Sequence, residues 1–217
     1  MSGETLKRKV YNLILEDIIY KKYPVDYILK EKELSEKFGI SKAPVREALI
    51  ELCAEDIVKS IPRAGYRIVQ FTEKDISEAT ELRLMLEEPV LETIINTISP
   101  ATIQKLRADV EHFKYAKANS TVPLDTWWND NIHFHVALNA LAGNSLLNST
   151  LKLVIRRQWR LIAQLFRRED LADYLVYKPS THMSLLSEIE KKNISKASDI
   201  LSEDILSIRY LFTYKHG

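Results

Sequence analysis

The sequence predicts a mainly α-helical protein in two parts: three helices with a β-hairpin at the N-terminus, then an all-α helical bundle. Apolar residues recur every three or four positions over most of the chain, which is typical of amphipathic helices. Two short β-prone runs around a basic turn lie between Ile57 and Val69. No strand is expected after Val69, so the remainder of the 217 residues should be helical.

Two helices are expected first. The first should begin near Leu6 and stop before Pro24, because its apolar residues follow the helical period over that stretch. The second should run from Lys30 to Phe38. Gly39 then suits the left-handed conformation that ends many helices.

A third helix should run from about Lys42 to Ala54, with Ser41 as its N-cap. Pro44 is tolerated because it lies in the first turn. The residues expected to face the core are Val45, Leu49 and Leu52. Three helices followed by a β-hairpin is the order of a winged helix-turn-helix, whose third helix enters the major groove of DNA.

The second domain should begin at Thr72, where a Thr-x-x-Asp cap precedes a long helical stretch. The domains expected are therefore 1–71 and 72–217. Breaks are expected at Gly143–Asn144 and Lys192–Asn193. The helices expected are residues 75–97, 100–119, 124–142, 145–168, 179–192 and 195–214. A bundle of this kind places ligand sites in its core, between facing helices.

Composition narrows the class of protein. Hydrophobic residues make up 46% and charged residues 28%, as in ordinary globular proteins, and no apolar run approaches the about 18 residues of a membrane span. Met1 to Lys9 is polar and basic, so we expect no export, no membrane and a cytoplasmic protein. Cys53, the single cysteine, should be a core residue. The net charge of +1 does not point to nucleic acid, so the DNA prediction depends on the motif.

That motif lies between Leu34 and Leu49, in the run LSEKFGISKAPVREAL. It resembles the signature L-A-x-x-L-G-V-S-R-T-P-V-R-E-A-L of the GntR family of bacterial transcription regulators. Arg63-Ala64-Gly65 follows at the distance expected for the wing. The resemblance implies a winged helix-turn-helix that binds a double-stranded DNA operator.

Lys42 and Arg46 are four residues apart and share one face of the third helix. Arg46 can contact guanine in bidentate fashion, whereas Lys42 suits a phosphate or a single base acceptor. Ser41 can donate to a phosphate. The alternative is that this face is merely solvated. By resemblance, the contact set also includes Lys32, Ala43, Arg63 and Gly65.

The departures from the family pattern include Lys42, Ala43 and Val25-Asp26. Lys42 stands where arginine is usual and Ala43 where threonine is common, which should alter the operator sequence and not DNA binding as such. Val25-Asp26 stands where Pro-Gly usually precedes the second helix.

Residues 72–215 resemble the FCD branch of the same family. The motifs that carry this resemblance are Arg83-x-x-Leu86-Glu87, Asn131-x-x-Phe134-His135, Ala142-Gly143-Asn144-x-x-Leu147 and His182-x-x-Leu185. Many proteins of this branch hold a divalent metal between three helices, and the metal in turn can bind a carboxylate effector.

Carried over to this chain, the metal ligands are Asn131, His135, His182 and Asp204. Asn131 replaces the usual aspartate, and Asp204 stands where the last histidine is expected. The set suits zinc, nickel or manganese, because imidazole nitrogens and carboxylate oxygens are ordinary ligands of such ions. The alternative is that His135 and His182 are hydrogen-bonded core residues of a metal-free pocket.

Four residues are candidates for effector binding. If Arg83 points into the helical bundle, as expected, it needs an anionic partner, which is either the effector or Glu87 one turn further on. Arg156 and Arg160, also four apart, either line the same cavity or form a solvated stripe.

Together these features predict a transcription regulator, repressor or activator, that binds a pseudo-palindromic operator as a homodimer. The resemblance to the FCD branch implies that its effector is a small organic acid. One alternative is a metal-dependent hydrolase with an appended DNA-binding domain; no H-E-x-x-H motif supports that reading, and we expect no enzyme. Another is a regulator whose second domain only dimerises.

Overall fold

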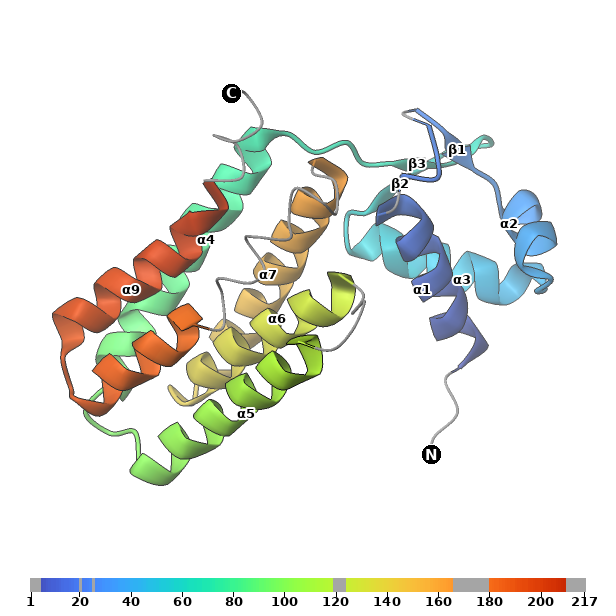
Figure 1. The fold of residues 1–217 in the computed structure, drawn as a ribbon. Coiled ribbons are helices and arrows are strands. Elements are labelled where there is room, and N and C mark those ends of the chain that lie inside the picture. Colours follow the sequence, from blue (N-terminus) through green and yellow to red (C-terminus); the bar gives the residue numbers. More distant parts are fainter. Residues whose placement is uncertain (1–4, 20, 25, 119–123, 166–179, 210–217) are drawn as a thin grey trace. The chain divides into compact units, whose positions relative to one another are not determined.

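The computed structural model describes residues 5–19, 21–24, 26–118, 124–165 and 180–209 (Figure 1). The chain divides into two compact units: the first contains the residues up to Thr72 together with Ala163–Leu165, and the second begins at Glu73 and contains the other described residues. None of the helices within the described ranges is long and apolar enough to span a membrane.

The first unit contains three helices and a small antiparallel sheet. Its elements are α1 (Leu6–Ile19), β1 (Ile28–Leu29), α2 (Glu31–Phe38), α3 (Lys42–Ala54), β2 (Val58–Ile61) and β3 (Gly65–Ile68). The predicted hairpin is β2 and β3, and the two-residue β1 adds a third strand that the pattern did not indicate, in the order β1-β3-β2. Gly39 ends α2 with φ 64°, the left-handed conformation expected of it.

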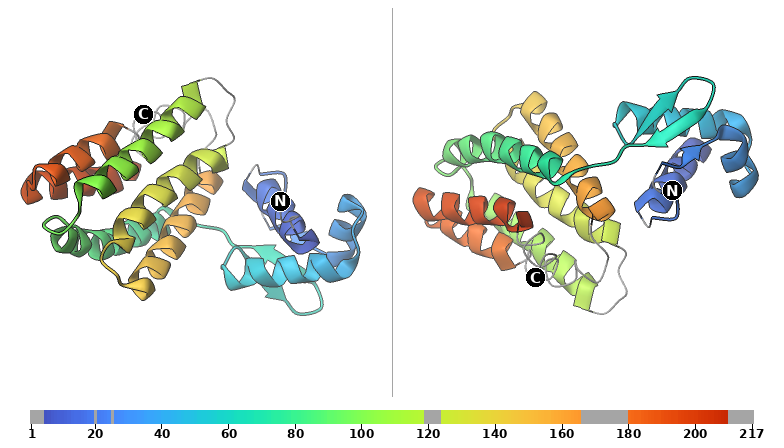
Figure 2. Two further views of the ribbon diagram at one scale, coloured as in Figure 1. Left: turned by 90° about the horizontal axis from the view of Figure 1, so that it is seen from below. Right: turned by 90° about the horizontal axis from the view of Figure 1, so that it is seen from above.

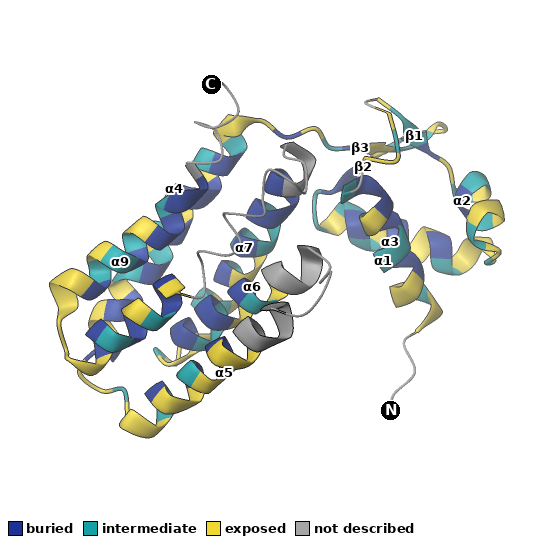
Figure 3. Ribbon diagram, in the orientation of Figure 1, coloured by how far each residue is buried: buried dark blue, intermediate teal, exposed yellow. Residues whose placement is uncertain are grey.

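The predicted core face of α3 is confirmed. Val45, Leu49 and Leu52 are all fully buried, and they pack with residues of α1 and β1 (Figure 3). Cys53 is only half-buried beside this core. Burial raises the pKa of its thiol, which agrees with a packing residue and not a reactive one.

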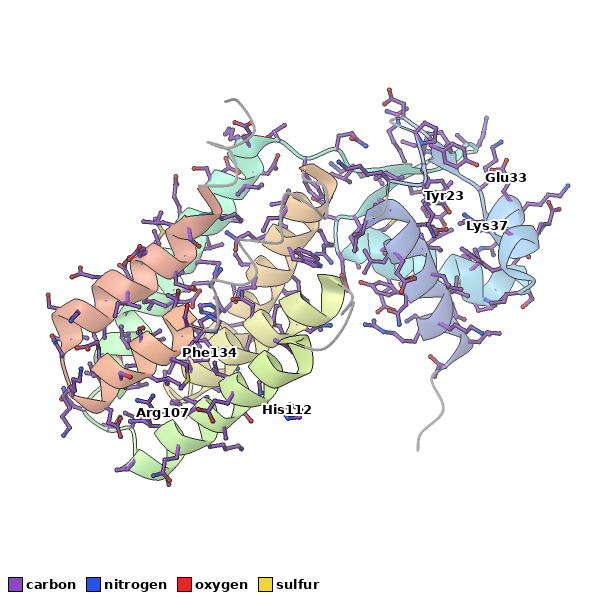
Figure 4. The ribbon with its side chains drawn as sticks, in the orientation of Figure 1. Tyr23, Glu33, Lys37, Arg107, His112 and Phe134 are labelled. Carbon is purple, nitrogen blue, oxygen red and sulfur yellow. The ribbon has the colours of Figure 1, made fainter. Side chains whose placement is uncertain are left out.

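A buried carboxylate joins α1 to α2. Asp17 of α1 accepts hydrogen bonds from Lys22 at 2.7 Å, Lys37 of α2 at 2.7 Å and the Tyr23 hydroxyl at 3.1 Å. Burial alone would raise the pKa of Asp17, but these three donors lower it below its ordinary value. Lys37 Nζ also donates to the Tyr23 hydroxyl at 3.2 Å, and the two side chains lie together in Figure 4. The network therefore ties α2, the helix that precedes α3, to α1.

The second unit contains helices and no strand among its described residues, as predicted. Its elements are α4 (Glu73–Ile94), α5 (Pro100–Ala118), α6 (Leu124–Ala140), α7 (Ser145–Leu165), a helical segment at 180–190, α9 (Ile194–Leu206) and η1 (Ser207–Arg209). The predicted breaks are present, with left-handed φ at Gly143 and Lys192. Four expected helix boundaries lie outside the described residues: the ends at Asn119, Arg168 and Tyr214, and the start at Pro179.

The helices of this unit pack side by side around one apolar core. Helix α4 lies along α9, and α5 lies along α6 (Figure 2). The core residues come from α4, α5, α6, the segment 180–190 and α9. A group of buried polar residues interrupts this interior: Thr80, Arg83, Glu87, Asn131, His135, Asn139, Gln158, Arg160, Thr181, His182, Asp204 and Ser207. Burying so many polar groups costs free energy unless they pair or bind something, which makes this interior the place to look for a site.

Candidate functional site

The residues predicted to contact DNA are nearly all exposed around the start of α3 and the hairpin. Lys32, Ser41, Lys42, Ala43, Arg46 and Arg63 are exposed, and Gly65 is half-buried. Ser41 is the N-cap of α3 as expected, but its side chain makes no capping hydrogen bond. Its hydroxyl is therefore not committed to the helix end. Lys32 forms a weak i, i+4 ion pair with Glu36 at 3.8 Å.

Arg46 has an acidic partner that the sequence pattern did not reveal. Its Nε and Nη2 atoms donate to the two carboxylate oxygens of Glu31, the first residue of α2, at 2.9, 3.1 and 2.8 Å. The Tyr66 hydroxyl of β3 donates to the same carboxylate at 3.4 Å. Arg46 nevertheless keeps 60% of its side chain exposed.

The hairpin tip is held in a left-handed conformation. Arg63 has φ 62° and Gly65 has φ 137°. A side chain at Gly65 would collide with the Leu29 carbonyl oxygen of β1. The glycine is therefore required by the packing of β3 against β1, whatever it also contributes at a DNA surface.

In the second unit, three of the four predicted metal ligands converge. His135 of α6, His182 of the segment 180–190 and Asp204 of α9 each offer a ligand atom within 4.8 Å of the others, and all three are buried. His135 Nε2 lies 3.1 Å and His182 Nε2 lies 3.8 Å from Asp204 Oδ2. Donor atoms around a tetrahedral ion with bonds of about 2.0–2.1 Å lie about 3.3 Å apart, so these separations suit a common ion.

Glu87 of α4 orients His135. Its Oε2 lies 2.6 Å from Nδ1 of His135, while its Oε1 accepts from Arg83 Nε at 2.7 Å. Burial alone would raise the pKa of Glu87, but the charge of Arg83 and the contact with His135 lower it to about 2. An ionised carboxylate on Nδ1 leaves Nε2 facing Asp204 and His182, the arrangement usual for a metal-binding histidine.

Asn131 lies one turn before His135 on α6 and is 5% exposed. Neither its amide oxygen nor its amide nitrogen has a hydrogen-bond partner among the residues that the structure describes. The ring of Phe134 stacks on the imidazole of His182, with 3.9 Å between the ring centroids and 11° between the ring planes. A buried amide without protein partners is expected where a further group completes its bonding.

The candidate effector residues occupy different environments. Arg83 is 2% exposed and also donates from Nη1 to Gln158 of α7 at 3.0 Å. Its Nη2 atom is buried and has no hydrogen-bond partner within the described ranges. Of the two partners that the sequence allowed for Arg83, the effector and Glu87, the structure shows the ion pair with Glu87. Arg160 is buried on α7, and Arg156 is half-buried on the same helix.

The structure thus brings Arg83, Glu87, His135, His182 and Asp204 into one connected polar site. Both oxygens of Glu87 are engaged, so it is not placed as the general base that a metal-dependent hydrolase would need. The motif reasoning missed Gln158 and the packing role of Phe134. Phe134 was visible as the neighbour of His135, but Gln158 lies 75 residues from Arg83, and no local signal indicates that contact.

Solved structures of other proteins share this fold. The structure described as E. coli McbR/YncC aligns over 98% of this chain and 100% of its own, with a TM-score of 0.71 and 18% identity. A putative transcriptional regulator GntR from Rhodococcus sp. RHA1 aligns over 95% of this chain and 97% of its own, with a TM-score of 0.66 and 18% identity. At such identities the likeness concerns the fold alone.

Sequence relatives include named regulators. The Uxu operon regulator of Haemophilus influenzae is 26% identical over 214 residues, covering 93% of this chain and 79% of that protein. The E. coli transcriptional repressor GlaR is 23% identical over 200 residues, covering 91% of each. The Bacillus subtilis regulator YdhC is 30% identical over 93 residues, and the match spans 42% of its length and 43% of this chain.

Two family models match adjoining parts of the chain. The model of the bacterial regulatory proteins of the gntR family matches residues 6–68, the unit with α3 and the hairpin. The model of the FCD domain matches residues 78–206, which include the buried polar site. The chain therefore belongs to the GntR family of transcription regulators, in the branch that carries an FCD domain behind a DNA-binding winged helix-turn-helix.

Proposed function

We propose that the protein is a transcription regulator that binds a pseudo-palindromic operator as a dimer and senses a small carboxylate through a divalent metal held in its FCD domain. The observation that carries this proposal is the convergence of His135, His182 and Asp204 from three helices, with Glu87 orienting His135.

The donor set fits a metal better than it fits a purely structural core. Two imidazole nitrogens and one carboxylate oxygen suit zinc or nickel, and manganese is also compatible with this set. The amide oxygen of Asn131 could supply a neutral fourth ligand, since it is buried and makes no hydrogen bond to the described residues. When bound, the ion would supply a Lewis-acidic position for a carboxylate oxygen.

Charge favours an anionic effector at this site. Without an ion, the charge of Arg83 is balanced by that of Glu87, and Asp204 carries a further negative charge, all three being buried. A divalent ion adds two positive charges, of which the Asp204 carboxylate balances one. A small carboxylate would compensate the remaining positive charge, with Arg83 Nη2 as an available donor.

The names of the relatives indicate the direction of control. GlaR of E. coli is a repressor, and the gluconate operon repressor of Bacillus subtilis is 34% identical over 87 residues, 40% of this chain. We propose that this protein is likewise a repressor, and that its effector is a sugar acid, hydroxy acid or related carboxylate.

The dimer is proposed to form through the helical domain. Leu146 and Leu153 of α7 are 75% and 59% exposed, and Met85 of α4 is 71% exposed. Leu146 and Leu153 are seven residues apart, so they lie on one face of their helix. Exposed large apolar side chains of this kind are expected where a second copy covers them.

The test is a DNA-binding titration at fixed salt, on a duplex enriched from a random-sequence library by the full-length protein. Metal-stripped and zinc-reloaded protein are compared, each with and without a panel of small carboxylates. We expect at least one carboxylate to lower affinity about tenfold in reloaded protein only, and two chains in each complex by mass. An equal response without metal, or one chain in each complex, would contradict the proposal. Asp204→Asn is the matched variant that should lose the response.

A further inference from the structure

We propose that Glu31 determines base specificity: it is a positioning residue that holds the guanidinium of Arg46 in the orientation that reads a base. The inference rests on the proposed contact of Arg46 with DNA. The observation behind it is a bidentate ion pair, in which the Glu31 carboxylate accepts hydrogen bonds from Nε and Nη2 of Arg46 at 2.9 and 2.8 Å.

The pair with Glu31 leaves the base-reading edge of the Arg46 guanidinium available. A guanidinium has five N–H donors in one plane, and Glu31 occupies the edge formed by Nε and Nη2. The remaining edge, formed by Nη1 and the second hydrogen of Nη2, is the one that can donate two parallel hydrogen bonds to O6 and N7 of guanine. Because the side chain is 60% exposed, that edge is accessible.

One edge of the Arg46 guanidinium is therefore fixed by Glu31, and the other edge is exposed and able to contact a base. A free arginine side chain loses rotamer entropy when it orders on a base, and a preformed pair reduces that cost.

Glu31 is itself anchored from a third element. It is the first residue of α2, where the helix dipole stabilises a negative charge. The hydrogen bond from Arg46, opposed by partial burial, lowers the pKa of Glu31, so the carboxylate is ionised at neutral pH. The Tyr66 hydroxyl of β3 contacts the same carboxylate. The orientation of Arg46 on α3 is thus set by α2 and by the hairpin together.

Two physical arguments predict different effects of removing the charge of Glu31, one on overall affinity for DNA and the other on base discrimination. A carboxylate beside a DNA-binding surface repels phosphates, so its removal should strengthen binding to every sequence. If Glu31 positions Arg46, its removal should instead weaken discrimination at the base pair that Arg46 reads. Base preference at a single position therefore separates positioning from charge.

The experiment selects duplexes from a random-sequence library with four full-length proteins: wild type, Arg46→Ala, Glu31→Gln and Glu33→Gln. Glu33 is the matched control, because it lies on the same helix, carries the same charge and pairs with Lys30 and Tyr27 instead. Unfolding midpoints of all four verify the fold. We expect Arg46→Ala and Glu31→Gln to lose about tenfold preference at the same base pair, and Glu33→Gln to keep the wild-type pattern.

A Glu31→Gln pattern identical to wild type, or a preference sharpened by the loss of the carboxylate, overturns the inference. If Arg46→Ala itself keeps the full pattern, the proposed contact of Arg46 with DNA is wrong and the inference fails with it. If Glu31→Gln does not fold, Glu31→Asp replaces it: the shorter side chain keeps the charge, so a loss at the Arg46 position supports positioning and an unchanged pattern contradicts it.

Discussion

Replacing Arg46 by alanine should weaken binding to the selected operator by about 100-fold or more and leave the protein folded. A bidentate arginine contact contributes about 1–3 kcal/mol of discrimination, and a dimer makes it twice, so even about 1.4 kcal/mol per subunit gives that factor. The fold should tolerate the change because Arg46 is 60% exposed and Glu31 keeps its contact with Tyr66. The measurement is a gel-shift titration at fixed salt on operator and on random-sequence duplex.

Arg8→Ala is the control for loss of a positive charge. Arg8 lies on α1 in the same domain, is 46% exposed and also pairs with a glutamate, Glu51, at 3.2 Å. It should weaken binding to both duplexes slightly and equally. Undiminished operator affinity in Arg46→Ala would show that the exposed face of α3 is merely solvated.

The Glu87→Gln variant should lose about 3 kcal/mol of unfolding free energy and bind metal about 10–100-fold more weakly. Arg83 would keep a hydrogen-bond acceptor but lose its counter-ion in an interior where it is 2% exposed. His135 would lose the ionised partner on Nδ1 that directs Nε2 to the ligand group. Urea unfolding and zinc titration of the full-length protein measure the two effects.

Glu92→Gln provides the comparison on the same helix. Glu92 is exposed on α4, so the same change of charge there should leave both the stability and the zinc affinity near those of wild type. If Glu87→Gln matches Glu92→Gln in both measurements, Glu87 neither balances Arg83 nor orients His135.

The sequence was most informative where local chemistry decides structure. Gly39 ends a helix because of its own left-handed conformation, and the apolar period of α3 placed Val45 and Leu49 in the core. The strand β1 was not predictable in this way. It has two residues, and it pairs with β3 only because Gly65 has no side chain to collide with Leu29.

The residues of the candidate site likewise fall into those that the sequence indicated and those that it did not. Resemblance to the FCD branch indicated His135, His182 and Asp204, and the structure brings these residues together. The partners that orient the functional side chains were not visible as pairs. Glu87 meets His135 across 48 residues and Glu31 meets Arg46 across 15, and contacts between separate helices leave no periodic signal in one sequence.

The most direct measurement is the metal content of the full-length protein purified without a histidine tag, by elemental mass spectrometry, beside His135→Ala and His182→Ala. Near-stoichiometric zinc, nickel or manganese in wild type and its loss in both variants is the result expected from the buried group of His135, His182 and Asp204. Absence of metal from wild type, or equal content in all three proteins, would contradict the account. His135 would then be a core residue between the carboxylates of Glu87 and Asp204.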